Sequence, residues 1–233
     1  MTNFKKLRQM IEVNGNGNIV SKEIKVSSFL RLHLSGKGLI EIHQSNEEKV
    51  IVETDENLLE YFDFANSGRT LYVTAGGNIR KPIFTKCVIK VYLRQINVLY
   101  IRNDKADVVC PNEIVLSEPL KIIIQSVGRT ELNINAPEIN LVSQCEGDVI
   151  IKGKCNIIKI KNQSEGNFDA SGLIAEELTI KNMAEGNVDL FANKSINISH
   201  YGEGYVHYAG NGTLKDVKQY GDGEIKFMPQ HQL

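Results

Sequence analysis

The C-terminal half of this 233-residue chain repeats a short pattern about every 19 residues, and this repeat constrains the fold more than any other feature. Each copy centres on an acidic residue followed by glycine. Successive glycines are 19, 20, 18 and 19 residues apart. An apolar residue stands two positions after each glycine and another six before it, and a small residue stands two before it. The five acid–glycine pairs are Glu146-Gly147, Glu165-Gly166, Glu185-Gly186, Glu203-Gly204 and Asp222-Gly223.

The length and hydrophobic pattern of one repeat favour a coil of short strands. Apolar and polar residues alternate around each glycine, as in Val188-Asp-Leu190, which is the period of a β-strand. A strand–helix–strand unit needs roughly 30 residues, so 19 are too few for one. A single coil cannot bury its inward side chains, but stacked coils can. We expect each glycine to provide a corner conformation that other residues avoid. The sequence therefore predicts an all-β fold, a right-handed parallel β-helix, or β-solenoid.

Composition excludes several classes of protein. The chain is 42% hydrophobic and 24% charged, which is typical of a folded globular protein. Its formal net charge is −1, so it lacks the excess of basic residues that a general nucleic-acid binder needs, and we predict no nucleic-acid partner. No stretch approaches the roughly 20 apolar residues of a membrane-spanning helix, and no spanning segment is predicted.

The N-terminal half is also rich in strands but less regular. We assign residues 1–19 to an extension or strand, 20–94 to a mixed-strand β part, and 95–228 to the solenoid, which is clearest over 128–228. Residues 55–60 are compatible with one short helical turn, and 75–86 are predicted to form a loop. Because no linker rich in glycine, serine or proline separates the halves, we expect one continuous fold.

The four cysteines show no motif of metal or disulfide chemistry. Cys87, Cys110, Cys145 and Cys155 form no closely spaced pair of the kind found in zinc sites. We expect small buried thiols at these positions.

The acids of the repeat form the first candidate site. In stacked coils, Glu146, Glu165, Glu185, Glu203 and Asp222 would lie along one edge, about 4.8 Å from coil to coil. We expect solvated turn residues and no metal, with a weak Ca²⁺ column as the alternative. Oxygens of Asp148, Asn167 and Asn187 would add ligands to such a column. The repeat lacks the GGxGxD pattern of calcium-binding β-rolls.

Recurring amide and aromatic residues form the second group of candidates. Asn162 and Asn182, each four residues before its glycine, predict either a structural amide ladder, which we favour, or a sugar-binding row. Tyr201 and Tyr220, each three before its glycine, are candidates for stacking on a sugar or contacting a protein partner.

Catalytic signatures are missing from the sequence. It contains no GxSxG, no HExxH and no phosphate-binding loop, so no catalytic residue and no cofactor are predicted. His33 and His43 flank residues 35–38, a predicted turn, and we expect them to face one another across adjacent strands in a structural role.

Several N-terminal stretches resemble a known family. Residues 26–43 and 50–58 resemble the opening of the putative auto-transporter adhesin, head GIN domain family, and residues 88–93, 99–101 and 104–108 resemble its second turn. The resemblance covers residues 20–228. It implies a bacterial, exported β-helical protein, often anchored at the cell envelope, with a role in adhesion. Its motifs are patterns of strands and turns, so no binding residue is carried over from the family.

These observations predict a non-catalytic interaction module that binds a glycan or protein surface through the faces of a β-solenoid. A polysaccharide lyase or hydrolase on the same fold and a calcium-stiffened structural spacer remain alternatives, and a homo-oligomer remains open. The first twenty residues lack a signal-peptide core. The expected location is therefore the cell envelope or the extracellular space if the resemblance holds and an export leader has been removed, and otherwise the cytoplasm.

Overall fold

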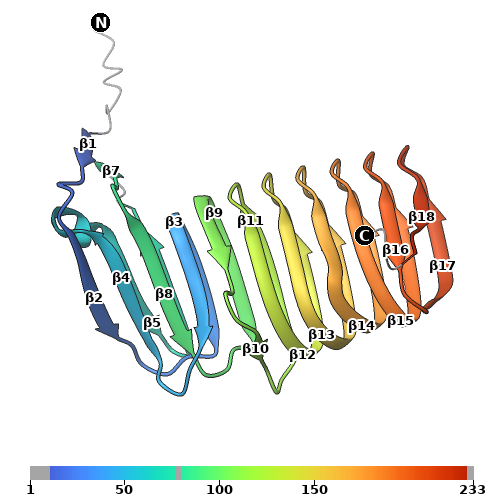
Figure 1. Cartoon of the computed structure of the whole chain (residues 1–233), viewed down its shortest axis with the longest axis horizontal. Helices are drawn as coiled ribbons and strands as arrows, with labels where there is room; N and C mark the ends of the chain where they lie inside the picture. Colours follow the sequence, from blue (N-terminus) through green and yellow to red (C-terminus); the bar gives the residue numbers. More distant parts are fainter. Residues whose placement is uncertain (1–10, 77–79, 230–233) are drawn as a thin grey trace, which may run out of the picture.

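The computed structural model describes residues 11–76 and 80–229 and shows a β-solenoid of about six turns (Figure 1). Sixteen strands belong to one continuous sheet that winds from coil to coil. The predicted all-β solenoid is therefore confirmed.

The solenoid is built from long strands that bend around its corners and pair in parallel with the next coil. Thirteen pairs join β12 to β13, from Thr130↔Val149 to Ser143↔Asn162, so the repeat of about 19 residues sets the register. The strands of this part are β9 (Val98–Val109), β10 (Ile114–Val115), β11 (Leu120–Ser126), β12 (Thr130–Ser143), β13 (Val149–Asn162), β14 (Phe168–Asn182), β15 (Val188–His200), β16 (Val206–Ala209), β17 (Thr213–Gln219) and β18 (Ile225–Phe227).

The N-terminal strands mix both directions, as the sequence predicts. The antiparallel pairs are β2–β4, β4–β8 and β5–β6, whereas β3 pairs in parallel with β6, β8 and β9. The short helix η1 lies where a helical turn was expected. The elements are β2 (Ile19–Lys25), β3 (Arg31–Gln44), β4 (Lys49–Asp55), η1 (Glu56–Tyr61), β5 (Phe62–Ser67), β6 (Thr70–Ala75) and β8 (Cys87–Leu93).

The predicted loop over 75–86 is wrong in part. Within it, β7 (Arg80–Ile83) pairs in parallel with β1 (Ile11–Asn14) to form a separate two-stranded sheet. Pairing with a strand about 70 residues away overrides the local turn signal of Gly76 and Pro82. Residues 77–79 of the predicted loop lie outside the described ranges. The predicted turn at 35–38 is also wrong, because β3 runs through it and bends at Gly36 and Gly38, whose φ angles are +120° and +94°.

The core runs along the solenoid axis. The apolar residues two positions after the repeat glycines pair directly from coil to coil, and those of the inner coils are at most 1% exposed. They are Val149, Phe168, Val188 and Val206. A coil separated from its neighbours would expose these side chains to water, so burial depends on the stack.

The repeat glycines have a different role from the one expected. None of them has a positive φ. A Cβ on Gly147 would lie 2.5 Å from the carbonyl oxygen of Gly128, and one on Gly166 would lie 2.6 Å from that of Gly147. Glycine is therefore required because the corner backbones of successive coils approach too closely for any side chain, and not because of a special dihedral angle.

All four thiols are free, and three of them are buried. Cys110, Cys145 and Cys155 lie in the core, and Cys87 is half-buried. Burial raises the pKa of Cys87, Cys110 and Cys155 to about 12. Because a thiol is nucleophilic only as the thiolate, these cysteines are packing residues.

Candidate recognition surface

The acidic column lies at an exposed corner of the solenoid. The side chains of Glu146, Glu165, Glu185, Glu203 and Asp222 are all exposed. The oxygens expected to complete a cation site are used elsewhere. Oδ1 of Asp148, Asn167 and Asn187 each accepts a hydrogen bond from the backbone N–H of the next coil, at 2.9, 3.0 and 3.0 Å. This side-chain ladder ties the corners together and engages each of those oxygens in a hydrogen bond between coils.

No group of three or more histidine, cysteine, aspartate or glutamate side chains forms a metal site within residues 11–76 and 80–229. The Ca²⁺ column thus stays a hypothesis that no ligand cluster supports.

The two candidate asparagines lie inside the solenoid. Asn162 and Asn182 are 0% exposed, and Nδ2 of Asn162 donates to Oδ1 of Asn182 at 3.0 Å. Asn182 Nδ2 is in turn 3.2 Å from Nδ1 of the buried His200. A ligand on the outer surface reaches neither amide. The sugar-binding interpretation of Asn162 and Asn182 is therefore wrong, and the structural ladder is what the sequence encodes.

The two candidate tyrosines lie outside the solenoid and form a stacked pair. The ring centroids of Tyr201 and Tyr220 are 4.9 Å apart, and their planes differ by 12°. Nζ of Lys181 lies 5.3 Å from the centroid of Tyr201. Tyr201 is 44% exposed and Tyr220 is 69% exposed. Since one ring stacks on Tyr201 and an ammonium group also approaches it, Tyr220 presents the more accessible ring.

A row of glutamines continues the line of these tyrosines toward the N-terminus, and sequence reasoning missed it. Nε2 of Gln125 donates to Oε1 of Gln144 at 2.9 Å, and Nε2 of Gln144 donates to Oε1 of Gln163 at 3.2 Å. Gln144 and Gln163 stand three residues before a repeat glycine, which is the position of the tyrosines, and Gln125 stands three before Gly128, nineteen residues ahead of Gly147. The repeat could therefore have predicted this row. We call this set the outer row: Gln125, Gln144, Gln163, Met183, Tyr201 and Tyr220.

Aromatic residues of the N-terminal coils extend the outer row. The hydroxyl of Tyr100 donates to Oε1 of Gln125 at 2.7 Å. The ring of His33 lies between Tyr100 and Tyr72, with centroid distances of 5.1 and 4.8 Å. Burial, followed by the charge of Arg31, lowers the pKa of His33. A polar and aromatic line therefore runs from β6 to the last coils.

The two histidines do not form the pair that the sequence suggested. His43 stacks on Tyr92 with a centroid distance of 5.0 Å and bonds to Glu41 at 2.9 Å, whereas His33 contacts Tyr72 and Tyr100. The bend of β3 between them carries the two residues onto different parts of the sheet.

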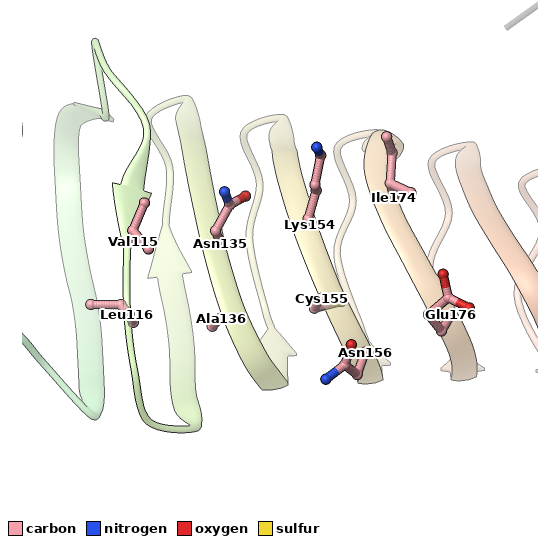
Figure 2. Close-up of a pocket in the computed structure, with 9 residues that line it drawn as sticks. All are labelled: Val115, Leu116, Asn135, Ala136, Lys154, Cys155, Asn156, Ile174 and Glu176. Carbon is pink, nitrogen blue, oxygen red and sulfur yellow. The ribbon is translucent and has the colours of Figure 1, made fainter.

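A pocket of about 350 Å³ opens on another side of the solenoid (Figure 2). Its residues come from β12, β13 and β14 and from the end of β10 with the residue that follows it, and these segments lie side by side. The lining combines exposed and buried apolar side chains with amide and charged groups. It consists of Val115, Leu116, Asn135, Ala136, Lys154, Cys155, Asn156, Ile174 and Glu176.

Two ionisable groups of this pocket, Glu176 and Cys155, have shifted pKa values. Glu176 is held by Lys194 at 3.1 Å, and hydrogen bonds from Lys194 and Asn193 lower its pKa. Burial keeps the Cys155 thiol protonated. The pocket therefore offers neither a proton donor with a raised pKa nor a thiolate nucleophile.

The pKa values of several other carboxyl groups are also lowered. Lysine neighbours lower the pKa values of Glu53, Glu131 and Glu138 through hydrogen bonds and charge. A glycoside hydrolase needs a carboxylic acid whose pKa is raised. In the part of the chain that the structure describes, every carboxyl group with a resolved pKa shift moves the opposite way.

Solved structures of bacterial proteins share this fold. A putative adhesin from Bacteroides fragilis is 22% identical, with a TM-score of 0.85, 93% of this chain covered and 100% of that chain. A putative adhesin from Parabacteroides distasonis is 20% identical, with a TM-score of 0.74 and the same coverage. A further protein from Parabacteroides distasonis, described as a putative lipid binding protein, is 18% identical, with a TM-score of 0.68 and coverage of 93% and 99%.

Comparison of sequences identifies the family. No curated protein is significantly similar to the chain. A helix able to span a bilayer is not found in the part of the chain that the structure describes. Residues 28–212 match the family described as putative auto-transporter adhesin, head GIN domain. This match covers most of the chain and includes the solenoid up to the start of β17, with the outer row as far as Tyr201, and the chain therefore belongs to the head GIN domain family.

Proposed function

We propose that this protein is a non-catalytic, adhesin-like recognition module that binds an extended polysaccharide along the outer row. The observation that carries the proposal is the continuity of that row. Its glutamines are fixed by one another, and it ends in an exposed tyrosine pair. The family and two of the solved structures that the chain resembles are described as putative adhesins, which supports an adhesive role and a location at the cell envelope or outside the cell.

The composition of the outer row suits a sugar polymer. Each glutamine offers both a donor and an acceptor, which matches the hydroxyl groups of a polysaccharide. The aromatic ring of Tyr220 is exposed for stacking on the apolar face of a sugar. Because coils recur about every 4.8 Å, a polymer along the axis meets an equivalent position at each coil. Tyr201 contributes mainly by holding Tyr220 in place.

The competing enzymatic function has less support. A polysaccharide lyase or hydrolase on this fold would need convergent acid and base groups, whereas the shifted carboxyl groups are paired with lysines or backbone donors and their pKa values are lowered. The calcium-stiffened spacer lacks a ligand cluster in the described residues.

Affinity electrophoresis in gels that contain single polysaccharides tests the proposal. We expect at least one polymer to retard the wild-type protein. The double variant Gln144→Ala/Gln163→Ala and the single variant Tyr220→Ala should each lose most of this retardation, since a buried stacking or hydrogen-bonding contact contributes about 1 kcal/mol.

A matched control is Lys152→Ala, which removes an exposed side chain from the first part of β13, away from the outer row. It should bind like the wild type. The proposal is wrong if no polymer retards the protein, or if the outer-row variants and the control are retarded equally. If the protein binds only a protein surface, no polysaccharide will retard it.

A further inference from the structure

The C-terminal end of the solenoid exposes side chains that every inner coil buries. In register, Leu214 pairs with Ile196 and Val217 pairs with Ile198, and both of these partners are at most 1% exposed. Leu214 itself is 36% exposed and Val217 is 43% exposed. In β18, which pairs with β16, Phe227 is 52% exposed although its partner Tyr208 packs on the core. The last coil therefore presents the apolar interior of the solenoid.

The same end presents open strand edges. In the described chain, β17 pairs only with β15, and β18 pairs only with β16. Each therefore has one edge whose backbone groups lack a strand partner. An exposed strand edge beside apolar side chains is a template for pairing with another chain.

The N-terminal end is protected against such pairing. Within the described ranges, the main sheet has two edge strands there, β2 and β5. Strand β2 carries the exposed charged residues Lys22, Glu23 and Lys25, which disfavour edge-to-edge association. Phe62 and Phe64 of β5 pack against the core there. A head-to-tail contact would need both ends, so only the C-terminal end is suited to association, and growth into a fibre is disfavoured.

The sequence of β17 is complementary to itself in one antiparallel register. When the twofold axis passes between Lys215 and Asp216, Leu214 lies opposite Val217 of the partner subunit. Lys215 then lies opposite Asp216 of the partner subunit, and symmetry repeats both pairs. Lys215 has no partner in the β15–β17 ladder, so β17 has a β-bulge at this residue. In the antiparallel pair, the bulges of the two copies lie next to one another at the twofold axis. The inward side chains of Leu214 and Val217 therefore stay on the same face of the paired strands in both copies.

We propose that the C-terminal coil is a dimerisation surface and that its partner is a second copy of this chain. The two β17 strands pair antiparallel about the axis between Lys215 and Asp216. The contact covers Leu214 and Val217 of both copies and joins the two solenoids end to end. Each outer row then ends at the junction, where Tyr220 follows β17.

Sedimentation velocity over a range of protein concentrations tests this proposal with the full chain. The wild type should sediment as a concentration-dependent dimer. Val217→Lys places a charge on the exposed edge and should shift the equilibrium to monomer by at least tenfold. Thermal unfolding should stay close to that of the wild type, since the residue is exposed in the single chain. A chain that is monomeric at every concentration would overturn the proposal, as would a dimer that Val217→Lys leaves intact.

Charge reversal tests the register. Lys215→Glu and Asp216→Lys each place like charges across the axis and should each weaken the homodimer. Mixing the two variant chains restores opposite charges at both pairs and should give a heterodimer, and the double variant should dimerise again. Lys121→Glu, an exposed reversal on β11, serves as the control and should dimerise like the wild type. Failure of the mixed chains to associate while the wild type dimerises would contradict this register.

Discussion

Tyr201 and Tyr220 stack on the outside of the last two coils, with ring centroids 4.9 Å apart and planes 12° from parallel. The two residues occupy the same position in successive repeats, so the stack follows from the register of β15 and β17. This relationship makes the pair both a stabilising contact and the exposed end of the outer row.

The tyrosine stack should be measurable as a coupling between the two side chains. Tyr201→Ala and Tyr220→Ala should each lower the free energy of unfolding by about 1 kcal/mol, and the double variant by less than their sum, because each single change already removes the stack. Urea unfolding of the four proteins measures this coupling. Strict additivity of the two changes would show that the rings do not interact.

The buried amide ladder should be more important for stability than any outward amide. Asn182→Ala removes the partner of both Asn162 and His200, leaving polar atoms buried without hydrogen bonds. We expect a loss of about 2–4 kcal/mol in the free energy of unfolding. Asn197→Ala, which removes an outward amide that bonds to Thr179, should cost less than about 0.5 kcal/mol. Similar losses for both variants would contradict burial of the ladder.

The corner glycines should tolerate no side chain. In Gly166→Ala, the new Cβ would lie 2.6 Å from the backbone of Gly147, so the stacked corners must separate. We expect a loss of more than about 2 kcal/mol, seen as a large drop in the melting temperature. Gly172→Ala is the matched control, because its nearest neighbour is the flexible Lys152 side chain. The explanation by close approach fails if Gly166→Ala melts like the control.

Acid should weaken the N-terminal strands through Glu53. Hydrogen bonds from Lys86 and Lys90 lower the pKa of this carboxyl to about 2 from 4.5. Because the folded pKa is depressed, the ionised group stabilises the fold above about pH 4.5, and this contribution is lost as the pH falls toward 2.

Glu53→Gln should therefore lower stability at pH 7 and reduce the loss of stability between pH 4.5 and 2. Chemical unfolding at a series of pH values measures both effects. Glu60→Gln, at an exposed position, provides the comparison and should follow the wild-type profile. An unchanged acid profile in Glu53→Gln would show that this ion pair does not contribute.

The repeat predicted the stacking of coils because its period and its apolar positions are local properties of the sequence. The buried amides were predicted only in part. The repeat position of Asn162 and Asn182 favoured a structural ladder and left a sugar-binding row open, because only the register shows that Nδ2 of Asn162 donates to Asn182 of the next coil inside the solenoid. The glutamines of the outer row share a repeat position with Tyr201, and they were overlooked because a single glutamine carries no chemical signature.

Other features depended on contacts between distant segments. Strand β7 forms because β1 supplies a partner about 70 residues away, which no local pattern predicts. The pocket of Figure 2 lies just after a register shift in the pairing of β13 with β14, between Ile150 and Gly153, and Gly153 has a positive φ of 117°. Irregularities of this kind change the shape of one coil without changing the repeat.

Binding without cleavage is the central claim, and one experiment measures both parts. Polysaccharides are incubated with the wild type and with Tyr220→Ala, and each sample is assayed for polymer retained by immobilised protein and for newly formed chain ends. We predict that the wild type retains at least one polymer, that Tyr220→Ala retains much less of it, and that neither protein produces chain ends. New chain ends from any polymer, or retention that does not depend on Tyr220, would contradict the account.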